Sequence, residues 1–411
     1  MNTSNSQGLP SRSRVSTAAL SRHFWQPPRA HGEVIDGREV SFLELFYDLV
    51  YVVVIAQASH HFAGHMTAAG AAQFAIVFGM IWFAWVNGAV YHDLHGRSDA
   101  RTRFYVFVQM GVLVLLAVFT SEATSGGGPA FALVYSAYLL ILGWLWYSVR
   151  RQDDPAFRPL TTPYLIGILG SAAIVAATAL LNDEARLIVW AILVISWLVG
   201  LAAIDMRRRP PGVPRMRASE STVERFDLLT IIVLGEVVVG VVNGIADADK
   251  TPVAIVTGVL GLGIGFAYWW TYFDLVGGRQ IAAARGAMAK WLVGHFLVTL
   301  SIAATGAVMV SMIRQASISQ RLGPATVVLA LSVAIGVLAL IPVTTALADW
   351  RELLPVYRRV SAALGIAAAV DLLIGWLTPP SWLQILLLTL LLAAIWAYAI
   401  LTWFSFVHRK P

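Results

Sequence analysis

"VSFLELFYDLVYVVVIAQASHHF", residues 40–62, is long and apolar enough to cross a lipid bilayer, yet it carries the two carboxylates Glu44 and Asp48. A helix of about 20 residues spans about 30 Å of hydrocarbon. On insertion scales, a charged side chain at the centre of such a helix costs roughly 2.5–3.5 kcal/mol. The stretch therefore predicts a membrane helix whose acids face protein rather than lipid.

The composition of the whole chain is typical of an integral membrane protein. Of its 411 residues 58% are hydrophobic, and the charged fraction of 13% lies far below the roughly 25% of a soluble domain. The net charge is +6, but the basic residues fall in short loops between apolar runs, so orientation in a membrane explains them better than a nucleic-acid partner. There is no cysteine, which excludes disulfides and thiolate metal sites.

Apolar runs of roughly 18–24 residues, the length that crosses a bilayer, recur along the chain. We place them near residues 41–62, 70–91, 104–121, 129–149, 164–181, 186–204, 221–244, 253–275, 291–313, 324–348, 360–378 and 382–407. The sequence therefore predicts an all-α membrane protein with about 12 transmembrane helices.

The basic residues are distributed unevenly between the loops. Of the 29 Lys and Arg residues, 24 fall near the N-terminus, in alternate loops and at the C-terminus. Basic residues near the ends of membrane spans stay on the cytoplasmic side. We therefore expect a protein of the inner cell membrane with both termini in the cytoplasm. Residues 1–37 are polar and have no apolar core, so they are expected to form a disordered cytoplasmic tail.

A second stretch, "STVERFDLLTIIVLGEVVVGVVNG" at 221–244, echoes the opening one after about 180 residues. The first acid of the pattern, Glu44 or Glu224, is followed two residues later by a phenylalanine in both stretches. Gln57 and Glu236 also lie within one residue of correspondence. The pattern favours an internal duplication, and the alternative is a chance likeness between two amphipathic helices.

The long basic loop between these stretches divides the chain into two sets of six spans. Residues 205–219 are rich in proline and arginine and are typical of a linker. Six is an even number, so both halves would enter the membrane from the same side. We therefore expect two parallel six-helix repeats, 38–204 and 220–411, and a site between them.

Three motifs also support a family resemblance. "ELFYDLVYVVVIAQASH" (44–60), "ERFDLLTIIVLGE" (224–236) and "YWWTYFD" (268–274) resemble the bacterial low temperature requirement A (LtrA) proteins, over most of the chain. The resemblance implies a multi-pass membrane protein of the cell envelope, and it makes the motif residues the best site candidates. The family is named for a growth phenotype, so the resemblance implies no particular chemistry.

Polar residues of the first span fall on two faces. Glu44, Asp48 and Tyr51 form one stripe, whereas Gln57 and His60 lie on the opposite side. We therefore expect this helix to be buried around nearly its whole circumference, with the acids facing a cytoplasmic vestibule or a basic partner. For Glu44, helix capping is the alternative to a functional role.

The seventh span carries a narrow polar strip. Arg225 and Glu236 are eleven residues apart, which places them within about 20° around the helix, and Asn243 continues the strip. Such a strip should face the bundle interior. Glu236 near mid-span is the first candidate for binding and releasing a proton, and a permanently satisfied structural acid is the alternative. Arg225 could pair with Glu224, with Asp227 or with the acid stripe of the first span.

Other polar residues are weaker candidates. Asp274, His295 and Asp371 lie in the eighth, ninth and eleventh spans. The residues "HDLH" at 92–95 are metal-ligand types, but without a partner carboxylate or thiol they are expected at a solvated helix end. Tryptophans could shape a cavity, although anchoring at the membrane interface is favoured for them: Trp82, Trp85, Trp269 and Trp270.

The absence of several known sequence motifs disfavours some function classes. There is no Walker sequence, H-E-x-x-H or nucleophile elbow, which disfavours an ATP-driven pump and familiar hydrolases. The leading hypothesis is a secondary transporter of an unknown small molecule or ion, with proton linkage through Glu236 and Asp48 and without a cofactor or metal. A membrane-embedded enzyme or lipid-handling protein with a Glu/Asp/His site is the alternative, and a structural or regulatory membrane partner is a third class.

Overall fold

The computed structural model describes residues 24–33, 38–206, 218–248, 250–316 and 323–408, and the long elements in these ranges are all helices. Twelve of them are long and apolar enough to cross a membrane. Their bounds are α2 Phe42–Gly64, α3 Ala68–His95, α4 Ala100–Thr120, α5 Gly128–Arg150, α6 Arg158–Ala177, α7 Asp183–Met206, α8 Glu220–Asp247, α9 Pro252–Leu275, α10 Ala287–Arg314, α11 Gly323–Thr344, α12 Leu354–Leu377 and α13 Ser381–Val407.

The predicted count of twelve spans is confirmed, and each predicted span coincides with one helix. Helix α6 begins at Arg158 rather than near 164. The start of α12 differs by as much, since this helix begins at Leu354 rather than near 360. Its first turns contain Arg358 and Arg359, which lower the hydropathy on which the prediction relied. The end of the chain after 408 and most of the predicted linker, residues 207–217, lie outside the described residues.

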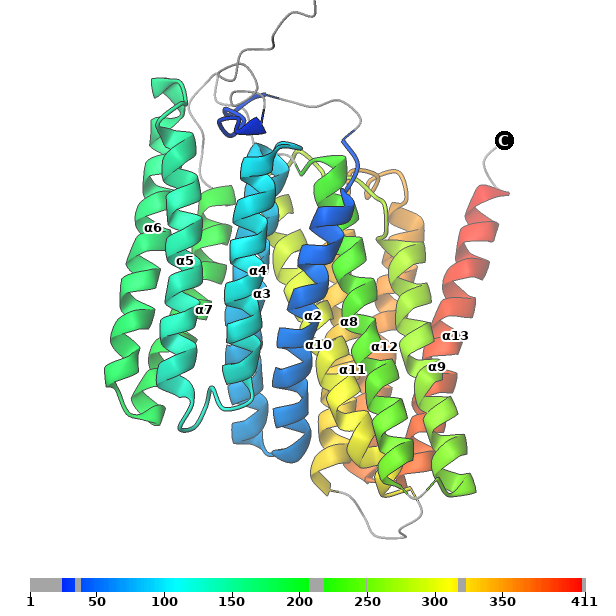
Figure 1. Cartoon of the computed structure of the whole chain (residues 1–411). Helices are drawn as coiled ribbons and strands as arrows, with labels where there is room; N and C mark the ends of the chain where they lie inside the picture. The colour runs from blue at the N-terminus through cyan, green and yellow to red at the C-terminus, as the bar shows by residue number, and fades with distance from the viewer. Residues whose placement is uncertain (1–23, 34–37, 207–217, 249, 317–322, 409–411) are drawn as a thin grey trace, which may run out of the picture.

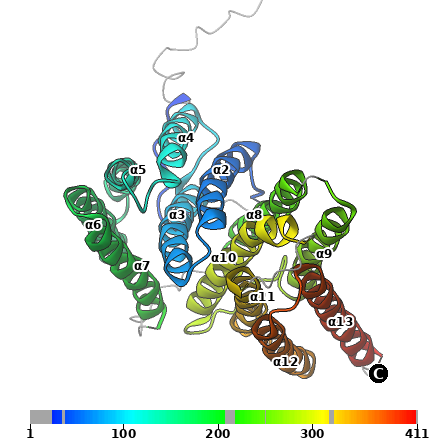
Figure 2. The same ribbon diagram turned by 90° about the horizontal axis from the view of Figure 1, so that it is seen from below.

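The helices form two groups that lie side by side, α2–α7 and α8–α13 (Figures 1 and 2). In the first group the packed pairs include α2 with α3 and α4, α4 with α5, α5 with α6, and α7 with α3 and α6. In the second group the corresponding pairs, in which each helix number is higher by six, are packed as well. They are α8 with α9 and α10, α10 with α11, α11 with α12, and α13 with α9 and α12. The two groups therefore share these pairs, although among the described residues α3 also packs against α5 and α9 against α10 without such a counterpart.

Loops that carry most of the basic residues lie together at the end of the bundle where α2 begins, the upper end in Figure 1. Contacts join segments that are far apart in sequence: 29–31 with 93–96 and 153, 205–206 with 285–289, and 279 with 349. We call this the basic end.

Helix α10 is the most buried of the twelve and packs against both groups. Its contact with α8 is close because small residues face each other. A Cβ atom added to Gly306 would meet backbone atoms of Glu236 at 2.6 Å, and one added to Gly240 would meet the Gly306 oxygen at 2.1 Å. In lipid, where apolar burial does not drive helices together, such close backbone approach is a main source of helix association.

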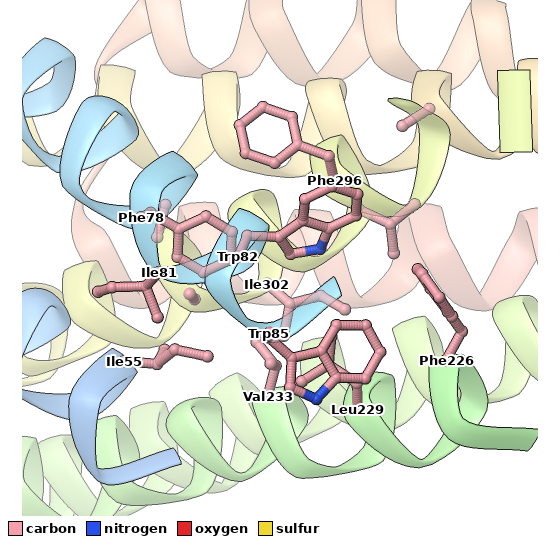
Figure 3. Packing of buried hydrophobic residues seen from close by; sticks show 14 of the residues in the cluster. Ile55, Phe78, Ile81, Trp82, Trp85, Phe226, Leu229, Val233, Phe296 and Ile302 are labelled. Atoms are coloured by element: carbon pink, nitrogen blue, oxygen red, sulfur yellow. The ribbon is translucent and has the colours of Figure 1, made fainter. Parts of the chain in front are cut away.

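Large aromatic side chains fill the space between α3, α8 and α10 (Figure 3). The ring of Trp82 packs against Phe296 at 5.3 Å, and Trp85 packs against Phe226 at 4.8 Å. Both tryptophans are buried, so the expectation that they anchor at the membrane interface is wrong. Trp269 on α9 is exposed, as an interfacial anchor would be.

Helix α2 is buried on one side only, which corrects the prediction that protein surrounds it. Its stripe of Glu44, Tyr47, Asp48 and Tyr51 is buried, whereas the other side carries exposed apolar residues. These are Phe42, Phe46, Leu49 and Val53. These exposed apolar side chains are suited to contact with lipid acyl chains. This side of α2, which was predicted to contact protein, therefore faces lipid.

The close approach of α8 and α10 can be tested with a single methyl group. We expect Gly306→Ala to destabilise the protein by about 1–3 kcal/mol, because the added Cβ would overlap the α8 backbone. The measurement is unfolding of the purified protein in detergent. Gly235→Ala on α8 is the control, since a Cβ there meets nothing within 4 Å. Equal stability of the two variants would contradict the packing described here.

Candidate functional site

A buried ion pair joins the two groups of helices. The Arg225 guanidinium on α8 donates to Asp48 Oδ1 on α2 at 2.6 Å, and both side chains are almost fully buried, at 1% and 0% exposure. Trp85 on α3 donates its indole N–H to the same carboxylate at 2.8 Å, and Arg225 also donates to the Ala89 carbonyl. Of the partners open to Arg225 in the sequence, the acid stripe of the first span is the one it contacts.

Glu44 extends this pair toward the basic end. It accepts a hydrogen bond from Arg38 at 2.6 Å and lies 3.7 Å from Arg225. It also forms a capping box with Ser41 at the start of α2. Capping and participation in the site were alternatives in the sequence, and in the structure Glu44 does both.

Asp93 completes the cluster from α3. It accepts hydrogen bonds from Arg38 at 2.6 Å and from three hydroxyl groups at the start of α8, those of Ser219, Ser221 and Thr222. Residues 92–95 form a helix end, as predicted, since α3 ends at His95, but the predicted solvation is wrong because His92, Asp93 and His95 are buried. Within the described ranges, no group of three or more His, Asp or Glu residues is placed to hold a metal ion.

We call Arg38, Glu44, Asp48, Asp93 and Arg225 the charge network. It contains three carboxylates and two guanidinium groups, so when all are ionised it has one excess negative charge. Asp93 accepts hydrogen bonds from hydroxyl groups at the start of α8, and the dipole of this helix favours an anion near its N-terminus. The start of α8 therefore compensates part of the excess charge.

Three tyrosines adjoin the network inside the first group of helices. The hydroxyl of Tyr138 on α5 lies 2.6 Å from that of Tyr47 and 2.7 Å from that of Tyr51, both on α2. Gly88 on α3 leaves room for them, because a Cβ there would lie 2.3 Å from the Tyr47 hydroxyl. Polar contacts thus run from Tyr47 and Tyr51 through Tyr138 to the Ala84 carbonyl, which accepts from Tyr138.

Glu236 lies deeper in the bundle, about 16 Å beyond Arg225 along α8. It is 5% exposed and packs against α10 near Gly306. Among the described residues it makes no ion pair, and the side chain that interacts with it is Ser59 of α2. Arg225 and Glu236 both face the interior, as the polar strip predicts.

Five other candidates lie away from the charge network or only at its edge. Asn243, expected to continue the interior strip, is exposed, which corrects that part of the prediction. Gln57 is half-buried at the outer surface of α2, and His60 is exposed. Glu224 is exposed and accepts from the Val40 amide, while the exposed Asp274 accepts from Trp396 on α13.

The two remaining candidates are in the second group of helices. His295 is fully buried and contacts Tyr272 of α9, which in turn contacts Asp227 of α8. Asp371 on α12 is 1% exposed, and neither of its carboxylate oxygens has a hydrogen-bond partner among the described residues. These residues are therefore not part of the charge network.

Sequence reasoning missed Arg38 and Asp93, although a signal for Asp93 was present. "YHDLHGR" at 91–97 recurs as "YFDLVGGR" at 272–279, so the end of α3 is a repeated motif like the start of α2. Arg38 carried no such signal, because it precedes the apolar run and was counted only as a basic residue near the tail.

Part of the predicted tail also packs onto the basic end. Arg29 is buried and donates to backbone carbonyls of Asp93 and Gly96. This burial lowers the pKa of the Arg29 guanidinium, an effect to which Arg38 adds. Residues 24–33 are thus not a free tail, whereas residues 1–23 and 34–37 lie outside the described ranges.

Twelve apolar helices and a buried charge network define a polytopic helical membrane protein. The model of the bacterial low temperature requirement A (LtrA) family matches residues 39–404, and the chain belongs to this family. An uncharacterized protein of Rhizobium meliloti (strain 1021) is 25% identical over 260 residues. That match covers 61% of this chain and 62% of the relative, so the chain spans less than two thirds of the relative's length.

The energetic coupling of Asp48 and Arg225 can be measured with a double-mutant cycle. Asp48→Asn or Arg225→Gln alone should each destabilise the protein by about 3–5 kcal/mol, because each leaves a buried charge without its partner. The double variant should lose clearly less than the sum. Unfolding in detergent is the measurement. For comparison, Arg97→Gln removes the exposed pair with Glu33 and should cost at most about 1 kcal/mol; strictly additive losses at 48 and 225 would disprove the coupling.

Proposed function

We propose that this protein is a secondary transporter of a small molecule or ion, and that proton binding at Glu236 is linked to transport. The observation that carries the proposal is the placement of buried charge between the two groups of helices. Asp48 and Arg225 join the groups near the basic end, and Glu236 lies deeper at the same interface, where none of the described residues forms an ion pair with it. Buried ionisable groups inside membrane bundles mark substrate or ion pathways far more often than they serve stability.

The proposed cycle uses the two acids differently. With Asp48 paired to Arg225, the bundle is closed near the basic end, and separation of α2 from α8 would open it. Glu236 can stay buried without a partner when it carries a proton, but its ionised form needs water or a cation. Proton release at Glu236 would therefore favour a conformation in which solvent reaches it, which is the coupling a secondary transporter needs.

We also propose that the halves are parallel repeats and that the basic end is cytoplasmic. The packed pairs that α2–α7 and α8–α13 share, together with the two recurring motifs, support duplication. The excess of Lys and Arg at the basic end supports the orientation. Rocking of two such halves around a central site is a common transport mechanism.

A lipid-handling role is the second candidate, and one observation favours it. A groove of about 470 Å³ on the outside of α2 and α4 is lined by apolar residues and by Gln57. An acyl chain would fit such a surface, with the amide as its polar contact. A protein that moves no solute but needs Gln57 for its activity would belong to this class.

Proton-coupled transport is tested in proteoliposomes with an imposed pH gradient. Uptake of a panel of labelled amino acids, sugars, organic acids and amines is measured together with an internal pH dye. We expect gradient-driven uptake by the wild type and at least a tenfold loss in Glu236→Gln, because the amide cannot bind or release a proton.

The control for this experiment is Glu224→Gln on the same helix, where the carboxylate is exposed and outside the bundle interior. It should transport like the wild type. If a pH gradient drove no uptake across the panel, or if Glu236→Gln retained coupled uptake, the proposed function would be wrong.

The absence of cysteine allows a direct test of orientation. Ser98→Cys lies at the basic end, and Ser125→Cys lies in the loop between α4 and α5 at the other end; both serines are exposed. We expect a membrane-impermeant thiol reagent to label Ser125→Cys in intact cells, and Ser98→Cys only after the membrane is opened. The reverse pattern would place the basic end outside.

A further inference from the structure

Asp227, Tyr272 and His295 form a continuous hydrogen-bonded chain across α8, α9 and α10. The Tyr272 hydroxyl oxygen lies 2.7 Å from Asp227 Oδ1 and 2.8 Å from His295 Nε2. His295 Nδ1 lies 2.8 Å from the Trp291 carbonyl oxygen, and the Gly278 amide donates to Asp227 Oδ2 at 2.8 Å. These atoms take no part in the charge network.

The number of hydrogens in this chain is fixed by its geometry. The Trp291 carbonyl can only accept, so His295 Nδ1 carries a hydrogen, and Oδ2 is already occupied by an amide donor. Two close contacts remain, from Asp227 to Tyr272 and from Tyr272 to His295. If Asp227 is ionised and His295 is neutral, the hydroxyl hydrogen of Tyr272 is the one hydrogen available for these two contacts. Two lone pairs then face each other within 2.8 Å.

We propose that Asp227, Tyr272 and His295 together bind one exchangeable proton, which completes both contacts. The proton from water adds to Asp227 Oδ1, which then donates to Tyr272 while Tyr272 donates to His295 Nε2. In the second form the carboxyl O–H bond breaks as the tyrosine receives that proton, and the tyrosine's own hydrogen forms an N–H bond at Nε2. The result is a carboxylate and an imidazolium with the same total number of protons.

The surroundings suit a relay between the edge and the interior of the bundle. Asp227 is half-exposed, whereas Tyr272 and His295 are buried, the latter against the rings of Phe226 and Trp291. Besides the three members, the charged group that acts on the relay among the described residues is Glu224, an exposed carboxylate. Arg225 faces α2 and α3 instead. No described cation compensates the negative charge that proton loss would leave.

This site does not depend on the proposed transport function. Proton binding by the relay is an equilibrium property, which is measured without a gradient or a substrate. Failure of the flux experiment would leave it intact, and its own failure would leave Glu236 and the transport proposal untouched.

The test is a pH titration of the full chain in nanodiscs, with ¹⁵N-labelled histidine for NMR and infrared detection of protonated carboxyl groups. The His295 signal is identified by its loss in His295→Gln. Near neutral pH we expect the relay to hold its one exchangeable proton, which is detected either as an imidazolium at His295 or as a protonated carboxyl group at Asp227. As pH rises, both signals should change together in one step.

Asp227→Asn is the decisive variant because its amide imitates the protonated carboxyl. The NH₂ group can donate to Tyr272 while the carbonyl accepts from Gly278, so every contact is satisfied with a neutral His295 and no exchangeable proton. We expect the variant to fold, and the affinity of His295 for a second proton to fall at least about tenfold, a shift of one pH unit.

Two further variants complete the design. Tyr272→Phe should split the single step into two independent ones, since it breaks the link between the acid and the imidazole. Tyr357→Phe is the matched control, because Tyr357 also contacts an aspartate, Asp349, but no histidine, and it should leave the His295 step unchanged. An ionised Asp227 beside a neutral His295 from about pH 5 to 8, or a His295 step that is unaltered in Asp227→Asn and Tyr272→Phe, would overturn the proposal.

Discussion

The contact between Asp48 and Arg225 constrains the whole bundle. Neither charge has access to water, so each depends on the other and on the few polar groups around them, the Trp85 indole and the Ala89 carbonyl. These partners lie on α2, α3 and α8, and they fix how far each helix is rotated about its axis and shifted along it. Trp85 belongs to both contacts, because it donates to Asp48 and packs against Phe226.

Packing in the rest of the interface depends on small residues and not on apolar area alone. Lipid tails solvate leucine as well as a protein interior does, so apolar side chains alone give helices little reason to associate. At the crossing of α8 and α10, Gly240 and Gly306 bring the two backbones into contact and seat Glu236 against α10. A buried acid thus lies where the backbones of two helices are in contact, and in the proposed function a change in its hydration is what would move them.

Span positions could be predicted from the sequence because hydropathy over about 20 residues depends on local composition. Which side chains of neighbouring spans contact each other could not be predicted, because these contacts depend on how each helix is rotated about its axis. The acid stripe that contains Asp48 was predicted to face a cytoplasmic vestibule or a basic partner, and Arg225 had Glu224, Asp227 and that stripe as possible partners. Asp93 was assigned to a loop because its neighbours are polar, although the start of α8 supplies hydroxyl donors that allow a charged helix end to be buried. The burial of Trp85 could not be predicted either, because a tryptophan near a span end can either anchor in the membrane interface or donate to a buried carboxylate.

The recurring motif at the starts of α2 and α8 shows why an acid–base pair can lie between two similar halves. Glu44 and Glu224 correspond in sequence, and if both faced the interface, two carboxylates would repel each other there. Instead Glu44 is buried and Glu224 is exposed, and the next residue, Arg225, occupies the interior. A rotation of α8 by the angle between neighbouring residues, about 100°, thus replaces a repulsive contact with an attractive one. Arg38 of the first half already pairs with Glu44 and Asp93, and the second half supplies the cation that Asp48 needs, so the first half alone could not bury Asp48 in an ion pair.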